Sequence, residues 1–389
     1  MASARGGLWA LFLAGLLMSL LGAVLPAWRY HIEPDFLLIA VYFLFQNAGI
    51  WLGTLAGRRL VARRGVAADL VMGCALAAIG LILLGLFSPP AHFAWRFAGL
   101  FVAGFGAGLI HTGALHAVAP AYEHEPASTL SLGGVLFNLG ALTTALVVAG
   151  AFFAYTIQAI LVLLALAPAA ASALYARSPR LSRIQREEPG WRETLRDFRS
   201  PAAVLFALLL FFQLGNEGAL TGWMALYLIQ RLGLSPVTSL LLLALFWLLL
   251  LLGRVAGLGL MRRFSAGRLL AGAVLFPMFG CLVLLATDNL FGAITAVVLI
   301  AGGFALILPL VMDRIAGRFP YFHPGFFSGI FSVALTGGFL APASVGFLAH
   351  FSGIGAVAGL PLAGSVAVFV LYWLLVLESK LSHRPEKLL

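Results

Sequence analysis

Long apolar stretches alternate with short polar segments along the whole chain. A helix needs about 20 apolar residues to cross the hydrocarbon core of a bilayer, and prolines, glycines or charged clusters separate the stretches that reach this length. The pattern predicts an all-α membrane protein with about 12 transmembrane helices. These helices are expected near residues 8–27, 35–57, 68–87, 93–118, 128–153, 155–176, 202–230, 236–260, 267–286, 290–316, 325–349 and 354–377.

The composition indicates that lipid, rather than water, surrounds most of the chain. Of its 389 residues, 62% are hydrophobic and 10% are charged, whereas soluble proteins carry roughly 25% charged residues. The net charge of +10 does not indicate nucleic acid as a partner, because the basic residues lie in the short segments between apolar stretches. Membrane proteins concentrate Lys and Arg in their cytoplasmic segments. With the N-terminus in the cytoplasm, only Arg29, Arg96 and Arg231 break this rule, and both termini are then cytoplasmic.

The longest polar segment, residues 177–200, divides the chain into two parts of similar length. We predict an N-terminal six-helix bundle (1–176), a cytoplasmic linker (177–200) and a C-terminal six-helix bundle with a short cytoplasmic tail (201–389). Within the linker, Trp191, Leu195 and Phe198 are spaced as in an amphipathic helix that lies on the membrane surface. A plain charged linker explains the segment equally well.

A short motif recurs at the end of the second helix of each predicted half. Gly53-Thr-Leu-Ala-Gly57 and Gly253-Arg-Val-Ala-Gly257 are each followed by a pair of arginines. Parallel six-helix repeats of this kind build transporters whose substrate site lies between the halves, near the middle of the membrane.

The first motif resembles the signature of the major facilitator superfamily, which has Gly, small residues, Asp, Arg and then Gly-Arg-Arg. Here Gly53-Thr-Leu-Ala-Gly57 is followed by Arg58-Arg59, and Gly57 stands where the signature has its Asp. Over the whole chain, the resemblance implies two pseudo-symmetric six-helix bundles, alternating access, a monomer and no cofactor. The high ratio of Arg to Lys, with abundant Ala, Leu and Gly, is typical of a bacterial protein, so the bacterial inner membrane is the expected location.

The seventh predicted span resembles the fucose–glucose–galactose permease branch of that superfamily. It reads Gly215-Asn-Glu-Gly-Ala-Leu-Thr-Gly-Trp-Met-Ala-Leu-Tyr-Leu, which is similar to the branch's acidic, Gly-Trp and Tyr-Leu pattern. This resemblance implies sugar transport coupled to protons. Sugar–proton members usually carry an acidic residue in their first helix, but residues 8–27 contain no ionisable side chain. The proton carrier must therefore lie elsewhere if the chain works in this way.

Glu217 is the main candidate for that carrier. It lies about 22 Å along the seventh helix, at ~1.5 Å per residue, which is close to the middle of the membrane. Ionisable groups are costly in hydrocarbon and usually functional there, although a structural carboxyl that joins helices is the alternative. His111 is a second candidate proton group, for which a hydrogen bond to a neighbouring backbone carbonyl is the alternative.

Polar and aromatic side chains at a similar depth are candidates for binding the substrate. Amides and hydroxyls match the donors and acceptors of a small polar solute, and flat aromatic rings match the C–H face of a sugar. Each residue alone is more often a contact between helices than a ligand contact. The candidate substrate-binding residues are Gln46, Asn47, Asn138, Gln213, Asn216, Trp223, Tyr227, Trp247 and Thr336.

Three charged residues on the predicted cytoplasmic side are candidates for gating. Arg58 lies in the signature loop, and Arg254 lies inside the eighth span. We expect Arg254 either to extend toward the cytoplasm or to pair with Asp313, near the cytoplasmic end of the tenth span. Counted along the helices, Glu217 lies further from the cytoplasm and is the poorer partner for Arg254.

The sequence therefore predicts a secondary active transporter for a small polar solute such as a monosaccharide, with a proton as the coupling ion. The alternative is an exporter of amphipathic drugs or lipids, although the fifth span lacks the Gly-Pro signature of such exporters. No motif for an enzyme or a nucleotide site is present. Cys74 and Cys281 each lie inside an apolar span, so neither a metal site nor a disulfide is expected.

Overall fold

The computed structural model describes residues 2–124, 126–153, 155–178, 198, 200–318 and 324–381. Throughout these ranges the regular structure is α-helical, as the apolar pattern predicts. Backbone N–H and C=O groups find no partners in lipid, so a helix, which satisfies them internally, is the structure that an apolar span adopts. The first group of helices is α1 (Ala2–Met18), α2 (Leu20–Ala27), α3 (Phe36–Leu86), α4 (Phe93–His124), α5 (Pro126–Ala151) and α6 (Ile157–Ala176). The second group is α8 (Pro201–Leu232), α9 (Pro236–Leu260), α10 (Ala266–Ala286), α11 (Leu290–Arg318), α12 (Pro324–Ser352) and α13 (Ala356–Leu381).

Within the described ranges, eleven helical segments are long and apolar enough to cross a membrane. One of them joins α1 and α2, and another is the 51-residue α3. At ~1.5 Å per residue, the two parts of α3 together contain about 76 Å of helix, which is enough for two crossings of a hydrocarbon core of about 30 Å. Its two parts meet at Gly65, where φ is 83° and ψ is 170°. Glycine adopts a positive φ without steric cost, so the chain reverses here, and the prediction of about 12 spans is confirmed.

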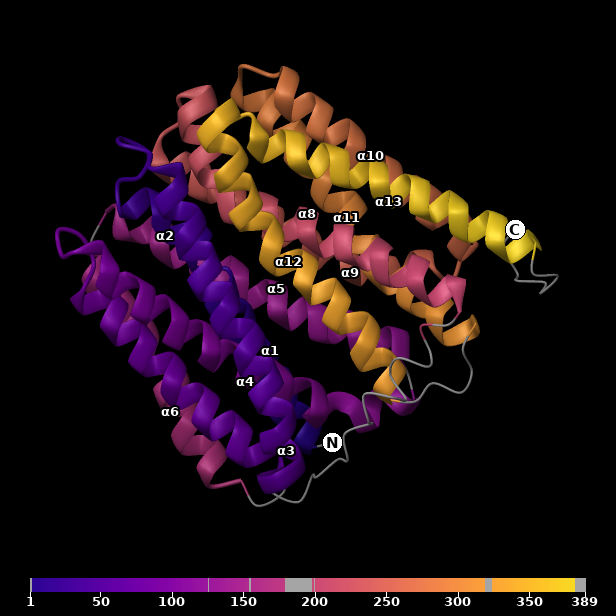
Figure 1. Cartoon of the computed structure of the whole chain (residues 1–389), viewed down its shortest axis with the longest axis horizontal. Helices are drawn as coiled ribbons and strands as arrows, with labels where there is room; N and C mark the ends of the chain where they lie inside the picture. The colour runs from indigo at the N-terminus through magenta and orange to yellow at the C-terminus, as the bar shows by residue number, and fades with distance from the viewer. Residues whose placement is uncertain are drawn as a thin grey trace.

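The two groups of helices lie side by side in Figure 1, with α1–α6 in indigo to magenta and α8–α13 in pink to yellow. The start of α1 and the end of α13 lie at the same end of the bundle (Figure 1). We call this end the inner side, because the distribution of arginines predicts that it faces the cytoplasm, and the opposite end the outer side. We divide the helices into these two groups at the predicted linker, most of which (179–197 and 199) falls outside the described residues.

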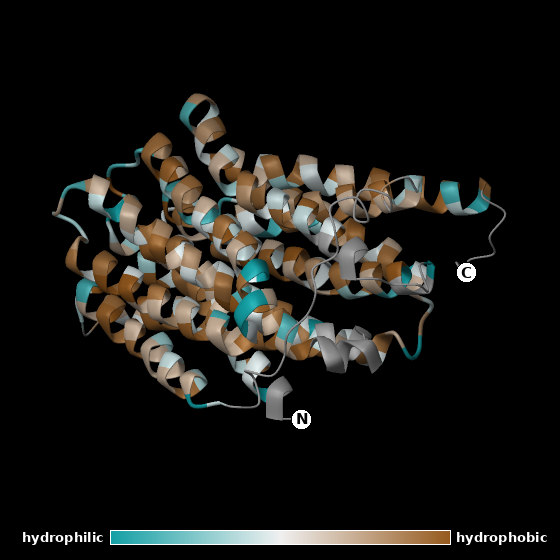
Figure 2. Cartoon of the chain, turned by 60° about the horizontal axis from the view of Figure 1, so that its bottom comes forward, coloured by the Kyte–Doolittle hydropathy of each residue, from teal (hydrophilic) through white to brown (hydrophobic). Residues whose placement is uncertain are grey.

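Hydrophobic residues dominate the helices, and hydrophilic ones gather mainly at helix ends and loops (Figure 2). Large apolar side chains are exposed along many helices, among them Leu163, Phe279 and Trp373. Water-soluble proteins rarely expose apolar surface on this scale. The chain is therefore a multi-pass membrane protein, with lipid against these side chains.

The predicted halves meet mainly along three pairs of helices, α3 with α12, α5 with α9, and α2 with α8, with smaller contacts of α5 with α11 and of α2 with α9. Toward the outer side, the contact between α2 and α8 is backbone to backbone, because a Cβ on Gly22 would lie 2.3 Å from the carbonyl oxygen of Thr221. The site described below lies between α5, α8 and α9, where the two halves face each other.

Candidate functional site

An ion pair between Arg254 of α9 and Glu217 of α8 lies at the centre of the site. Arg254 Nη2 is 3.9 Å from Glu217 Oε1, and the two side chains are only 7% and 12% exposed. The predicted pair between Arg254 and Asp313 is wrong for this structure, because Asp313 is exposed and forms no ion pair among the described residues. Residue counts along α8 and α9 did not predict the pair for two reasons. The two helices begin at different depths in the membrane, and the long side chain of Arg254 places its guanidinium far from its own Cα.

Gly134 of α5 makes room for the arginine. A Cβ at this position would lie 2.1 Å from Arg254 Nη1 and 2.9 Å from Cζ. The guanidinium of the C-terminal half therefore lies directly on the backbone of a helix in the N-terminal half. Since α5 belongs to the other half, any separation of the halves at this level changes the surroundings of Arg254.

Three further buried side chains near this pair have polar atoms without partners. Both amide atoms of Asn138, both amide atoms of Gln213 and Nε1 of Trp247 are buried and make no hydrogen bond, and the same holds for Nε of Arg254. Asn138 lies one turn from Gly134, Gln213 one turn from Glu217, and Trp247 two turns from Arg254, each on the same helix face. We call Asn138, Gln213, Glu217, Trp247 and Arg254 the central polar cluster.

The lack of partners in this cluster is energetically unfavourable as it stands. Leaving a buried polar group unsatisfied costs about 1–3 kcal/mol, and most native proteins avoid it. The separation of 3.9 Å between Arg254 and Glu217 is too long for a hydrogen bond. At such a distance a water molecule or a hydroxyl group of a solute can bridge the two side chains. The cluster is thus suited to hold water or a polar solute.

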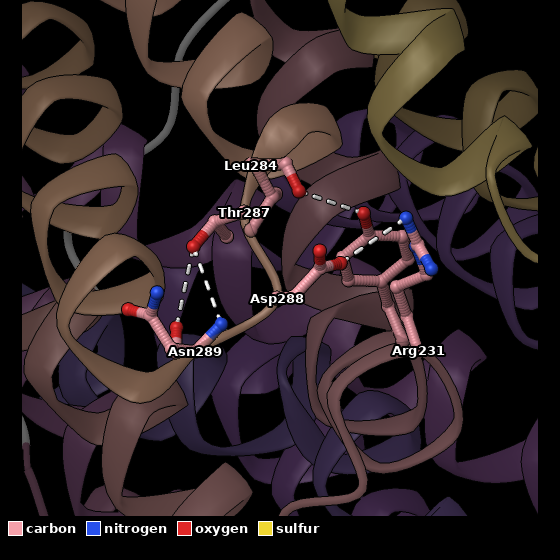
Figure 3. Close-up of polar contacts among 6 residues, drawn as sticks. Arg231, Leu284, Thr287, Asp288 and Asn289 are labelled. Carbon is pink, nitrogen blue, oxygen red and sulfur yellow. Dashed lines mark hydrogen bonds and ion pairs between the residues drawn. The ribbon is translucent and has the colours of Figure 1, made fainter.

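Two predicted substrate residues of α8 face the interior of their own half. Asn216 Nδ2 donates to Ser365 Oγ of α13 at 3.3 Å, and the Tyr227 hydroxyl donates to the Leu284 carbonyl oxygen of α10 at 2.9 Å. Figure 3 shows the outer end of this region, where Arg231 pairs with Asp288. The structure therefore places Asn216 and Tyr227 as contacts between helices and does not bring them to the central polar cluster.

Trp223 lies closer to the outer side, where α8 meets α3 and α12. Its indole N–H donates to the Pro342 carbonyl oxygen at 2.7 Å, and its ring packs on Phe36 and Phe43. Gly346 leaves room for the ring, because a Cβ there would lie 2.7 Å from Trp223 Cζ2. The side chain is fully buried and fills the outer contact between the halves.

The remaining candidate binding residues lie along α3 and α12. Gln46 donates to the Leu17 carbonyl oxygen of α1, within its own half. Asn47 crosses between the halves and donates to the Phe339 carbonyl oxygen at 2.7 Å. Thr336 is half-buried and bonds to the carbonyl oxygen of Ser332, one turn before it on its own helix.

The other two predicted residues lie toward the inner side. Arg58 Nη2 donates to Ser332 Oγ of α12 at 3.0 Å, which is a contact between the predicted halves. His111 is half-buried on α4, outside the central polar cluster. The geometry of Arg58 suits the predicted gating role.

The burial of two charged residues, Arg96 and Asp69, was not predicted from the sequence. Arg96 is 5% exposed, and its guanidinium carbon lies 5.6 Å from the ring centroids of both Trp28 and Tyr42. Asp69 of α3 is fully buried, and no side chain among the described residues pairs with its carboxylate. An acidic residue inside an apolar span was the available signal for Asp69, whereas nothing in the sequence indicated an aromatic enclosure around Arg96.

A cavity of about 380 Å³ lies away from this site, at the outer ends of α2, α5 and α6. Its lining includes Arg29, His31 and Phe152. Burial lowers the pKa of His31, and the nearby charge of Arg29 lowers it further. Within the described residues no group of three or more His, Cys, Asp or Glu side chains could hold a metal ion.

Comparisons with known proteins agree with this architecture. The sequence profile of the Major Facilitator Superfamily matches residues 7–342. An uncharacterised MFS-type transporter of Yersinia pestis is 23% identical over 359 residues, which cover 90% of each chain.

Two solved structures of a fucose:proton symporter share the fold at 16% identity, each covering 96% of this chain and 98% of the symporter. The TM-score is 0.64 for a variant of the Escherichia coli protein and 0.65 for a structure in the outward conformation. With a profile match over most of the chain and a shared fold over nearly all of it, the protein belongs to the Major Facilitator Superfamily and is a membrane transporter.

Proposed function

We propose that this protein is a secondary active transporter that moves a small, polar, uncharged solute of the monosaccharide class by alternating access, coupled to a proton carried by Glu217. The observation that carries the proposal is the central polar cluster, a set of buried polar side chains without partners where the two predicted halves face each other. Supporting it, the solved structures with this fold include one described as a fucose:proton symporter.

The chemistry of the cluster favours a neutral solute with several hydroxyls. Asn138 and Gln213 each offer a donor and an acceptor, which is the pairing that a hydroxyl group uses. The indole N–H of Trp247 adds a donor. Because the charges of Arg254 and Glu217 offset each other, the cluster has no excess charge to attract an ionic substrate.

Glu217 suits the role of proton carrier because its partner is close but not hydrogen-bonded. A carboxylate in the membrane interior needs a compensating charge, which Arg254 provides at 3.9 Å. When Glu217 is protonated, it loses its electrostatic attraction to Arg254. The ion pair with α8 then no longer holds the Arg254 guanidinium against α5. Protonation is thereby linked to the contact between the halves.

The test is uptake by the purified protein in liposomes, with a panel of hexoses and an imposed proton gradient. We expect concentrative uptake of at least one hexose by the wild-type protein and its loss in Glu217→Gln, with binding retained. The matched control is Glu33→Gln, which removes an exposed carboxylate outside the spans. Concentrative uptake by Glu217→Gln at the wild-type level would contradict the role of this residue.

A second outcome concerns the class of substrate. If lipophilic cations stabilise the protein against heat and hexoses do not, an exporter of amphipathic compounds replaces the monosaccharide proposal, because a ligand that binds only the folded state raises its melting temperature.

The proposal includes an orientation in the membrane. We place the protein as a monomer in a bacterial inner membrane, with both termini in the cytoplasm, as the distribution of arginines predicts. Reporter fusions at both termini test this orientation. Activity of a periplasm-dependent reporter at either terminus would refute it.

A further inference from the structure

The cavity at the outer ends of α2, α5 and α6 plays no part in the proposed transport. Its volume of about 380 Å³ lies within the range of about 300–1,000 Å³ that is typical of small-molecule pockets. The residues that line it belong to the first group of helices and to the segments that follow α2 and α5. A ligand bound here can therefore stay in place when the predicted halves separate.

The lining of the cavity is mostly apolar, with a basic region formed by two residues. Its apolar residues include Ile32 after α2, Phe152 after α5 and Ile157 at the start of α6, and its ionisable residues are Arg29 and His31. None of the described residues that line the cavity is acidic. Arginine is well suited to bind phosphate, so the matching ligand has an anionic group attached to an apolar part.

The cavity lies at the depth expected for lipid head groups. Helix α5 ends at Ala151 and α6 begins at Ile157, so the lining comes from the ends of membrane spans. Phe153 and Tyr155, between these helices, are 78% and 68% exposed, and exposed aromatic side chains gather at membrane–water interfaces. A lipid whose phosphate lies at this depth has its acyl chains beside the apolar helices below.

An unusual backbone conformation holds Arg29 beside the cavity. Its φ is 66°, and among the described residues it is the only non-glycine residue with a positive φ. The Arg29 N–H donates to the Pro26 carbonyl oxygen, and the next N–H along the chain donates to that of Leu25. This is the pattern that ends a helix with a left-handed residue, which is usually glycine because other side chains are strained there. Strain of this kind clusters at functional positions.

Arg29 also differs from the other two arginines predicted on the outer side. Arg231 pairs with Asp288, and Arg96 is buried against two aromatic rings. Arg29 forms no ion pair among the described residues. Burial lowers the pKa of His31, and the charge of Arg29 lowers it further. An anion in the cavity would pair with Arg29 and offset this repulsion.

We propose that this cavity binds an anionic phospholipid, with its phosphate at Arg29 and His31 and its apolar part along Ile32, Phe152 and Ile157. The lipid joins the end of α2 to the turn between α5 and α6. It is a resident ligand of one half of the protein and not the transported solute.

The experiment measures the melting temperature of the detergent-purified protein at fixed pH. We expect a short-chain phosphatidylglycerol to raise it by about 3 °C or more, and the zwitterionic phosphatidylcholine of the same chain length to raise it by less than about 1 °C. Glycerol phosphate, which has the anionic group without the chains, should leave it unchanged at the same concentration. The shift should be the same in Glu217→Gln, because the cavity lies away from the central polar cluster.

Substitutions of Arg29 separate binding from folding. Arg29→Gly relieves the left-handed conformation, so the protein without lipid should melt at the wild-type temperature or above it, while the shift with phosphatidylglycerol is lost. Arg29→Lys should restore a shift that Arg29→Gly lacks, because it returns the positive charge. Arg231→Gln is the matched control, since it removes an arginine on the outer side that does not line the cavity, and it should keep the wild-type shift.

A third position tests the cavity without changing charge. Ala151 belongs to the apolar lining, so Ala151→Leu fills part of the space and should reduce the shift with phosphatidylglycerol. This variant also keeps the inference falsifiable if Arg29→Gly folds poorly.

Several results would overturn the inference. No shift with phosphatidylglycerol, or an equal shift with phosphatidylcholine, would remove the anionic lipid, and an equal shift with glycerol phosphate would assign the cavity to a soluble anion. A wild-type shift in Arg29→Gly or Ala151→Leu would place the lipid elsewhere, and an equal loss in Arg231→Gln would show a general effect of charge. Failure of the proposed transport is distinguishable, because it would appear in hexose uptake and leave these shifts unaffected.

Discussion

Replacing Trp223 with leucine tests whether this ring holds the outer side of the interface closed. Its ring centroid lies 5.7 Å from that of Phe43 and 6.2 Å from that of Phe36. Each aromatic pair contributes about 0.5–1.5 kcal/mol beyond the area that it buries. Both partners belong to the other predicted half, so losing both pairs disfavours the closed interface by about 1–3 kcal/mol. The ratio of outward-open to closed molecules then rises by about 5- to 150-fold.

The assay reads opening from the outer side through a cysteine at Ala40. This residue lies in the same contact, because a Cβ on Gly346 would be 2.8 Å from Ala40 Cβ and 2.7 Å from the Trp223 ring. In Trp223→Leu, we expect an impermeant maleimide to label the cysteine at least fivefold faster than in the parent. Trp223→Phe is the control. It keeps an aromatic ring toward Phe36 and Phe43, and the N–H bond that it loses goes to Pro342 within the same half, so its rate should stay near that of the parent.

Two results would refute this reasoning. Labelling of folded Trp223→Leu at the parent rate would show that the ring contacts do not hold the interface closed. A loss of hexose affinity with unchanged labelling would instead return Trp223 to the substrate site, where its sequence context had suggested it.

Three further substitutions follow from the geometry. Gly65→Ala forces a side chain into a φ of 83° and should lower the stability measured by thermal unfolding by about 1 kcal/mol or more; an unchanged melting curve would contradict the strained reversal. Gly134→Ala should displace the Arg254 guanidinium and weaken stabilisation by a bound hexose in a thermal-shift assay, whereas Gly150→Ala, whose added Cβ meets nothing within 4 Å, should not. Arg231→Gln removes an exposed ion pair and should change the thermal stability by less than about 1 kcal/mol; a larger loss would show a structural role that the exposure does not suggest.

The number and placement of the spans could be predicted because lipid leaves the chain few alternatives. A run of about 20 apolar residues in a bilayer becomes a helix, and the apolar pattern therefore determined most of the fold. The continuity of α3 was not predictable from that pattern. Apolar character stops at Arg58, but arginine is a good helix former, so the helix continues through the basic segment until Gly65 reverses it.

The arrangement around the site was harder to predict because helices in a membrane bundle are apolar on most faces. The four-residue spacing of Gln213 and Glu217 puts both side chains on one face of α8. It could not show that Asn216 faces α13 instead of the other half, since both neighbours are buried surfaces. Nor could it find the partner of Arg254, which depends on the relative depth of two helices and on a glycine in a third.

Hydrogen bonding distinguishes Asn216 and Tyr227 from the residues of the central polar cluster. Asn216 and Tyr227, which point into their own half, both have hydrogen-bond partners. Asn138, Gln213 and Trp247, which belong to the central polar cluster, have none. Each unpaired buried polar group lowers the stability by about 1–3 kcal/mol. Apolar residues would therefore stabilise an interface that only holds the halves together. A transporter instead needs these polar groups to bind its solute. Asn216→Leu should therefore lower the stability of the empty protein, while Gln213→Leu should preserve or raise it and abolish stabilisation by the solute. The reverse pattern in thermal unfolding would show that Gln213 supports the fold and would remove it from the binding site.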